Sequence, residues 1–187
     1  MKIAVLAIQG AFIEHEKKLE ALGAECFELR QKKDLDTGFD GLVLPGGEST
    51  VQGKLLRELD MFDALKEKIE SGMPVLGTCA GLILLADQLT NDGHVYFGTL
   101  PVSVRRNAYG RQLGSFHTVQ EFAGIGKVPM TFIRAPYIEE AKAGTQVLAE
   151  VDGHIVAVRS KNQFGMSFHP ELDADNRIHE LFLKTVE

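Results

Sequence analysis

Short apolar runs alternate with helical patterns through the first ninety residues, and this alternation limits the folds open to the chain. Residues 3–8 form a continuous apolar run, as expected of a central parallel strand that is covered on both faces. The expected strands are 3–8, 24–29, 41–44 and 74–76, and the expected helices are 12–22, 50–59, 61–71 and 80–89. This β-α order predicts an α/β fold, a doubly wound, mostly parallel sheet with helices on both faces.

The pattern changes after residue 90. Short strand-like pieces follow, notably 101–104 and 112–120, and we expect a small antiparallel insertion on the main sheet. Strands resume at 130–133, 146–150, 154–159 and 163–168, with Asp152-Gly153 as a hairpin turn, and residues 175–186 form a closing helix. No repeat or linker marks a boundary, so we expect residues 1–187 to form a single domain.

Charge and hydropathy exclude several classes of protein. The net charge of −6 and the lack of a polybasic run argue against a nucleic-acid partner. The apolar run near the N-terminus is too short for a signal peptide, and no later run reaches the ~18 residues that a membrane span needs. Two cysteines, Cys26 and Cys79, fit a reducing compartment better than a disulfide framework, so we expect a cytoplasmic protein with no membrane partner.

Cys79 stands at the turn between the expected strand 74–76 and the helix that begins at Ala80. Gly77 and Gly81 flank it at the spacing of a nucleophile elbow, where glycine lets the backbone bend sharply and leaves the nucleophile exposed. A helix N-terminus favours a thiolate, and the amide of Ala80 points to where a tetrahedral oxyanion would form. The pattern favours acyl transfer over the ordinary interpretation, a small buried thiol.

Residues 45–50 (PGGEST) place two glycines directly after an expected buried strand. Such a backbone can approach a ligand closely and offer an N–H to an oxyanion, while Ser49 or Thr50 caps the next helix. The stretch lacks the spacing and the Lys-Ser/Thr ending of a phosphate-binding loop. It is therefore a candidate wall of an acyl-transfer site.

His169 and Glu171 follow the expected strand 163–168. Histidine is the side chain suited to activate a thiol near pH 7 and to protonate a leaving amine. Glu171 could orient the imidazole, with Pro170 keeping the backbone between them extended. The other five histidines have no comparable partners in the sequence: His15, His94, His117, His154 and His179. No C-x-x-C or H-x-x-x-H pair indicates a metal site.

Three motifs together carry a family resemblance. Residues 45–50 (PGGEST), 77–81 (GTCAG) and 167–171 (SFHPE) resemble, in order and spacing, the class I (triad) glutamine amidotransferases, which have a flavodoxin-like fold. The glutaminase subunits of pyridoxal 5′-phosphate synthase are a closer match over nearly the whole chain. That match rests on residues 7–11 (AIQGA) with His15, on 106–112 (RNAYGRQ) and on 132–136 (FIRAP).

The resemblance implies a role for each motif. Cys79 is then the nucleophile, His169 the general base and acid, and Glu171 the orienting carboxylate. Gly47 and Ala80 supply oxyanion amides. The residues implied in holding the α-amino and α-carboxylate groups of L-glutamine are Gly47, Glu48, Ser49, Arg106, Ile133 and Arg134. No cofactor or metal is implied, and residues 91–98 match no motif of the family.

The resemblance also implies a partner, the synthase subunit of pyridoxal 5′-phosphate synthase in a large hetero-oligomer, which receives the ammonia. Gln9 ends the first strand on the sheet edge that carries Cys79, so we expect it in or beside the contact with that subunit. Gly46-Gly47 could let a docked partner rotate one peptide into an oxyanion-donating orientation.

Three alternatives remain open. The chain could be a triad glutaminase that serves another enzyme, such as imidazole glycerol phosphate synthase. It could be a cysteine hydrolase or peptidase on a similar elbow fold. It could also be a non-catalytic binding or stress-response module in which Cys79 is merely redox-active.

Overall fold

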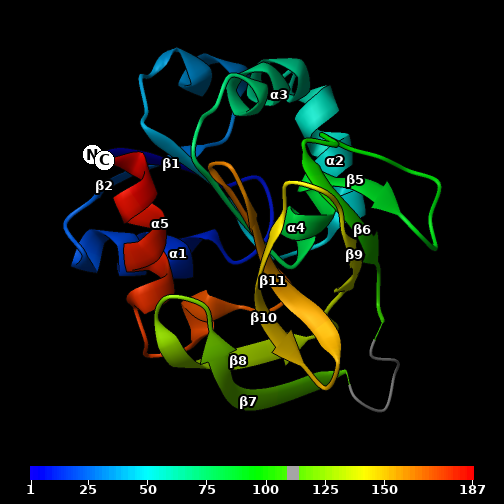
Figure 1. The fold of residues 1–187 in the computed structure, drawn as a ribbon. Coiled ribbons are helices and arrows are strands. Elements are labelled where there is room, and N and C mark those ends of the chain that lie inside the picture. The colour runs from blue at the N-terminus through cyan, green and yellow to red at the C-terminus, as the bar shows by residue number, and fades with distance from the viewer. Residues whose placement is uncertain (109–113) are drawn as a thin grey trace.

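The computed structural model describes residues 1–108 and 114–187, which form a ten-stranded sheet flanked by helices and a separate two-stranded hairpin (Figure 1). The strands are β1 (Lys2–Leu6), β2 (Glu25–Leu29), β3 (Gly41–Leu44), β4 (Val75–Thr78), β5 (Ala86–Leu89), β6 (Leu100–Arg105), β7 (Ser115–Phe122), β8 (Gly126–Ile133), β9 (Tyr137–Ala141), β10 (Gln146–Val151), β11 (His154–Ser160) and β12 (Gln163–Met166). The helices are α1 (Phe12–Ala21), α2 (Ser49–Glu58), α3 (Phe62–Glu70), α4 (Ala80–Leu85) and α5 (Arg177–Val186), with 3₁₀ turns η1 (Lys32–Asp36) and η2 (Pro170–Leu172).

Five neighbouring strands, in the order β2-β1-β3-β4-β12, run parallel. Every residue of β3, β4 and β12 is buried, as their apolar runs require for strands covered on both faces. The remaining strands continue the sheet as β11-β9-β6-β5, largely antiparallel, and β10 pairs with the edge of β11. The predicted α/β fold with a mostly parallel sheet is confirmed.

Helices cover both faces of the sheet and enclose two apolar cores (Figure 1). Leu56 of α2, Leu65 of α3 and Leu84 of α4 belong to the core on one face. Leu19 of α1 and Phe182 of α5 belong to the core on the other face, to which the β7–β8 hairpin also contributes. The carboxyl ends of the parallel strands lie at one edge of the sheet, and the candidate site lies at this edge.

Several predicted boundaries are wrong. The helix expected to run to residue 89 ends at Leu85, because residues Ala86–Leu89 form β5 and pair with β6. A short apolar run does not distinguish strand from helix, and pairing decides it here. Strand β9 was not predicted, and β12 ends at Met166 rather than at residue 168.

The expected insertion is divided between two sheets. Strand β6 joins the main sheet beside β9, whereas β7 pairs only with β8 in the hairpin. The Asp152-Gly153 hairpin turn is confirmed by the pairing of Val151 with His154. Residues 112–113 of the predicted strand 112–120 lie outside the described residues.

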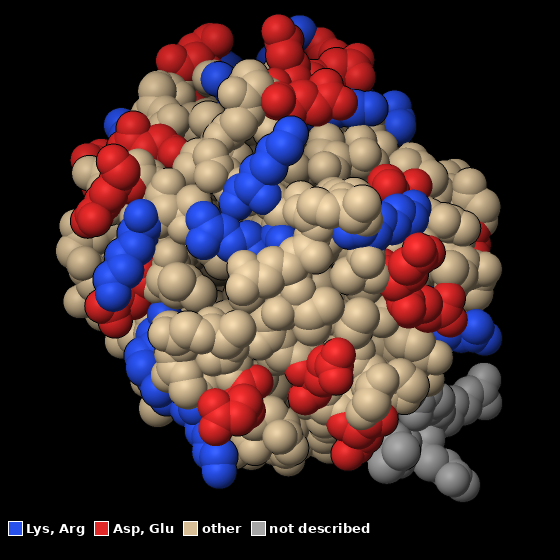
Figure 2. Space-filling model, viewed as in Figure 1, with Lys and Arg blue, Asp and Glu red and all other residues tan. Residues whose placement is uncertain are grey.

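Acidic and basic side chains are interspersed over the face seen in Figure 2. In the part of the chain that the structure describes, no helix combines the length and the apolar character needed to cross a membrane.

Candidate active site

Cys79 occupies a sharp elbow between β4 and α4. Its backbone angles, φ 49° and ψ −100°, lie in a region that residues other than glycine rarely adopt. A Cβ atom on Gly81 would lie 2.0 Å from the carbonyl oxygen of Leu44, and one on Gly77 would lie 2.8 Å from the carbonyl carbon of Gly81. Both glycines are required by close backbone packing, so the elbow inferred from their spacing is confirmed.

Strands β4 and β12 bring Cys79 and His169 together. They are parallel neighbours in which Met166 pairs with Thr78, and the N–H of Cys79 donates to the carbonyl oxygen of Met166 at 2.7 Å. The chain leaves β12 and reaches His169 three residues later, where the N–H of His169 donates to the carbonyl oxygen of Thr131 at 2.8 Å. The sheet and the β7–β8 hairpin thus fix the backbone on both sides of the site.

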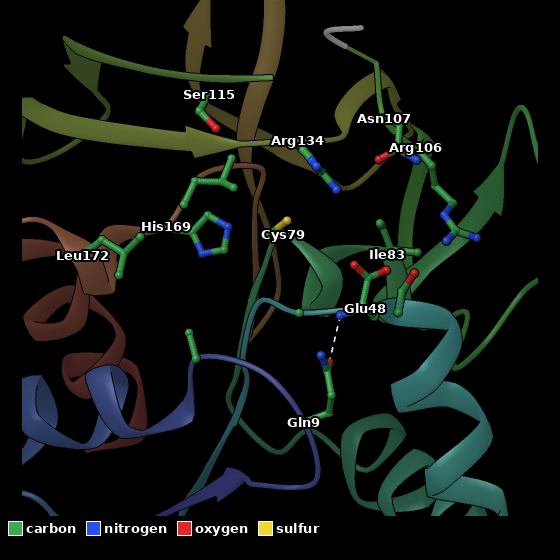
Figure 3. A pocket seen from close by; sticks show the side chains of 14 residues that line it. Gln9, Glu48, Cys79, Ile83, Arg106, Asn107, Ser115, Arg134, His169 and Leu172 are labelled. Carbon is green, nitrogen blue, oxygen red and sulfur yellow. Dashed lines mark hydrogen bonds between the residues drawn. The ribbon is translucent and has the colours of Figure 1, made fainter. Parts of the chain in front are cut away.

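His169 lies beside Cys79 (Figure 3), and it forms a buried pair with Glu171. The Nδ1 atom of His169 lies 2.7 Å from Oε1 of Glu171. The backbone between them was predicted to be extended, and this is wrong, because Pro170 begins the 3₁₀ turn η2. This turn folds the carboxylate of Glu171 back onto the ring of His169.

Burial alone would lower the pKa of His169, but hydrogen bonds with Cys79 and Glu171 outweigh it and raise this pKa to about 10. Burial would raise the pKa of Glu171, but the neighbouring His15 and His169 rings hold it below its ordinary value. At neutral pH the pair is therefore an imidazolium held by a carboxylate.

The prediction that the other histidines lack comparable partners is wrong. Nε2 of His15 lies 3.3 Å from Oε2 of Glu171, and its Nδ1 lies 2.9 Å from Nε2 of His179. His117 pairs with Asp173 at 3.2 Å, directly after the η2 turn. These partners come from elements far apart in the sequence, so no local pattern could have indicated them.

A pocket of about 650 Å³ opens above Cys79 and collects most of the predicted site residues (Figure 3). Its lining is Gln9, Ala11, Gly47, Glu48, Ser49, Cys79, Ile83, Arg106, Asn107, Ser115, Ile133, Arg134, His169 and Leu172. Ala80 and Glu171, which were also predicted, do not line it and lie buried behind it. Sequence reasoning did not predict five of the lining residues as site residues: Ala11, Ile83, Asn107, Ser115 and Leu172. Among the residues that the structure describes, no group of three or more His, Cys, Asp or Glu could hold a metal ion.

Residues 45–50, here called the glycine loop, are held in their observed conformation by residues 9–11. The carbonyl oxygen of Gly46 accepts the N–H of Ala11 at 3.0 Å, and Oε1 of Gln9 accepts the N–H of Glu48 at 2.8 Å (Figure 3). A Cβ atom on Gly47 would lie 2.3 Å from Oε1 of Gln9, so a larger residue there would displace the Gln9 side chain from its bond with Glu48. Gln9, predicted as a residue of a partner interface, supports the loop.

The two arginines of the pocket differ in their partners. Arg106 donates from Nη1 to Oδ2 of Asp92 at 2.6 Å and from Nη2 to Oγ1 of Thr50 at 3.0 Å. Asn91 exchanges two further hydrogen bonds with the Arg106 backbone, so residues 91–98, which match no family motif, begin with two residues that brace Arg106. Arg134 points into the pocket and is, among the described lining residues, the arginine without an ion pair (Figure 3). Residues 109–112 of the predicted RNAYGRQ motif lie outside the described residues.

Fold and site together define an α/β protein with a nucleophile elbow and a Cys-His-Glu constellation. The sequence matches the model of the SNO glutamine amidotransferase family over residues 5–187. This chain belongs to that family.

Individual relatives agree with the family match. The chain is 66% identical to pyridoxal 5′-phosphate synthase subunit PdxT of Desulfitobacterium hafniense (strain Y51), over 100% of this chain and 94% of that protein. It is 54% identical to the PdxT subunit of Methanocorpusculum labreanum, over 100% of this chain and 98% of that one. A crystal structure of a glutamine amidotransferase, 41% identical, has a TM-score of 0.93 over 98% of both chains.

Proposed function

We propose that this chain hydrolyses L-glutamine to glutamate and ammonia, and supplies the ammonia to a synthase subunit for pyridoxal 5′-phosphate (vitamin B6) biosynthesis. One observation carries the proposal. A cysteine with a charged histidine shares its pocket with Glu48 and Arg134, whose opposite charges suit the two ends of an amino acid. The particular synthase is inferred from relatives named PdxT.

The first half of the reaction forms a thioester. The thiolate of Cys79 attacks the side-chain amide carbon of glutamine and yields a tetrahedral oxyanion. The Nδ1 of His169 faces Glu171, so its Nε2–H faces Cys79 and protonates the amide nitrogen of the intermediate, which leaves as ammonia when the C–N bond breaks. Glu171 holds the ring in that orientation and stabilises its charge.

The second half releases glutamate. His169 is neutral after it has given its proton to the leaving nitrogen, so it can take a proton from the water that attacks the glutamyl thioester. Collapse of the second tetrahedral intermediate returns the thiolate and the imidazolium to their starting states. Ammonia and glutamate are the two products.

In this proposal the backbone amides of Gly47 and Ala80 stabilise the oxyanion. Ala80 is the first residue of α4, where backbone N–H groups are free of helix partners. The carbonyl oxygen of Gly46 accepts the N–H of Ala11. Because the Gly46–Gly47 peptide is trans, the N–H of Gly47 points in the opposite direction, away from Ala11.

Substrate binding in this proposal uses the charged rim of the pocket. Arg134 pairs with the α-carboxylate, and Glu48 with the α-amino group. Oγ of Ser49 is buried and has no hydrogen-bond partner among the described residues, which is consistent with a partner supplied by the substrate. Arg106 and Ile133 complete the walls, with Arg106 held by Asp92.

The partner of the proposal is the synthase subunit, assembled with this chain in a large hetero-oligomer. Gln9 links the end of β1 to the glycine loop through the Glu48 N–H, so a protein that docks on Gln9 can move that loop. We therefore expect low activity of the chain alone and a higher activity when the synthase subunit is bound. The proposal treats residues 1–187 as a single amidotransferase domain in the cytoplasm, where the free thiols Cys26 and Cys79 are stable.

The test is a glutaminase assay with and without the synthase subunit of the same organism. Wild-type protein with the synthase subunit should release glutamate, and Cys79→Ala should not. Release of ammonia only from peptides or other amides would refute glutamine as substrate. Equal activity with and without the synthase subunit would refute the activation but leave the glutaminase reaction in place.

A further inference from the structure

Two histidines behind Glu171 take no part in the proposed reaction. His15 of α1 and His179 of α5 are both fully buried, at 0% exposure. Nε2 of His15 lies 3.1 Å from Oγ1 of Thr78 and 3.3 Å from Oε2 of Glu171, while its Nδ1 lies 2.9 Å from Nε2 of His179. His15 thus contacts both the residue before the nucleophile and the carboxylate of the His-Glu pair.

Polar atoms of this cluster that lack a hydrogen-bond partner indicate which ring nitrogens carry the protons. Oε2 of Glu171 and Nδ1 of His179 have no hydrogen-bond partner in the described part of the chain. If His15 carried its proton on Nδ1, His179 would carry a buried, unpaired Nδ1–H, and a lone pair of His15 would face the carboxylate. With the proton on Nε2 of both rings, His179 donates to His15, and the N–H of His15 faces Glu171 and Thr78.

We infer that His15 is a positioning residue: its Nε2–H donates to Oγ1 of Thr78 and lies 3.3 Å from Oε2 of Glu171, a polar contact that keeps this carboxylate beside Thr78, and His179 fixes the tautomer of His15. The inference rests on the proposed function, because it assigns His15 to the support of that reaction. One ring then ties the carboxylate that orients the base to the strand that presents the nucleophile. His15 does not line the pocket, so it acts only through these neighbours.

Both rings are neutral in this arrangement. Burial lowers the pKa of His15 and of His179 below the ordinary value, although Glu171 opposes the shift at His15. The titratable groups that act on His15 or His179 are Glu171, His169, Glu14 and Lys18, together with the other ring of the pair. A neutral donor can contact one oxygen of Glu171 without adding a second positive charge next to the His169 imidazolium.

The test compares His15→Gln with His15→Met. The two side chains have nearly the same shape and length, but only glutamine places an N–H donor near the position of Nε2. The matched control is His154→Met, which makes the same change at the start of β11, outside the pocket lining. Glutamine hydrolysis is measured with the synthase subunit present, and folding is checked by thermal unfolding.

We expect His15→Met to lower kcat by about tenfold or more with little change in KM, and His15→Gln to recover much of that loss. Equal kcat in the two variants would mean that His15 only fills space, and would overturn the inference. A second readout needs no turnover, namely the low-field proton resonance of His169 Nδ1–H, assigned by its loss in His169→Asn. It should persist in His15→Gln and shift in His15→Met, and an unchanged resonance in both variants would count against the inference even if the glutaminase proposal failed.

Wild-type protein provides a test that does not depend on the stability of the variants. Nitrogen-15 spectra of labelled histidine should show His15 neutral, with its proton on Nε2, between pH 6 and 8. A proton on Nδ1, or a charged His15 ring, would overturn the inference.

Discussion

Gly46 lies directly against the ring of His169, the proposed general base, and adding one methyl group there should strongly lower activity. A Cβ atom on Gly46 would lie 2.3 Å from Cε1 and 2.8 Å from Nδ1 of His169, whereas ordinary contact begins at 3.4 Å. The ring or the loop must therefore move by about 1 Å, which is enough to misalign the 2.7 Å bond between His169 and Glu171. A misplacement of about 1 Å in an active site can cost on the order of 100-fold in rate. We predict that Gly46→Ala lowers kcat/KM by about 100-fold and the free energy of unfolding by about 1–3 kcal/mol.

The assay measures glutamine hydrolysis with the synthase subunit in excess, alongside denaturant unfolding of the isolated chain. Gly38→Ala is the matched control, because a Cβ atom there meets nothing within 4 Å. The control should change stability by no more than about 0.5 kcal/mol and leave the rate unchanged. Wild-type turnover in Gly46→Ala, with the glycine loop and His169 unmoved, would refute the reasoning.

Three further predictions follow from the site. Cys79→Ala should abolish hydrolysis without unfolding the chain, and Cys26 should not replace it, because burial, with help from Glu20 and Glu16, raises the pKa of Cys26 to about 12; residual ammonia release near the wild-type rate would disprove this. Glu171→Gln should retain more activity than His169→Asn. Glu171→Gln should also move the alkaline limb of the kcat/KM profile from about pH 10 to lower pH, because Glu171 helps to raise the pKa of His169. An alkaline limb at the same pH in this variant would contradict that role. Gln9→Ala should weaken activation by the synthase subunit, measured as the ratio of rates with and without it, and an unchanged ratio would remove Gln9 from the switch.

The parts of the site that depend on local backbone geometry could be predicted from the sequence. The spacing of Gly77 and Gly81 around Cys79 is dictated by contacts of the elbow with itself and with β3. The proximity of His169 and Glu171 follows from their separation of two residues. The β-α alternation of the first half could be predicted because each buried parallel strand is a continuous apolar run.

Contacts between distant elements could not be predicted in the same way. His15 and Glu171 lie more than 150 residues apart, and an isolated histidine on a helix gives no sign of its buried partners. Asp92 was not foreseen as the partner of Arg106, because a short polar loop carries no periodic pattern. Strand β9 has exposed and half-buried residues around Ile138, and it is a strand because β6 and β11 pair with it.

The pairing of β4 with β12 sets a limit on how this enzyme can be regulated. Parallel neighbours stand about 4.8 Å apart, and that spacing is fixed by hydrogen bonds in the interior of a sheet. The N–H of Cys79 itself donates to the carbonyl oxygen of Met166 at the end of β12, so Cys79 cannot move away from His169 without breaking hydrogen bonds between two central strands. Control of turnover must therefore act on the groups around Cys79 and His169. One such group is the glycine loop at residues 45–50, which is held by hydrogen bonds from Gln9 and Ala11, just after β1. A protein that activates this chain can leave Cys79 and His169 in place and change only the conformation of the glycine loop beside them.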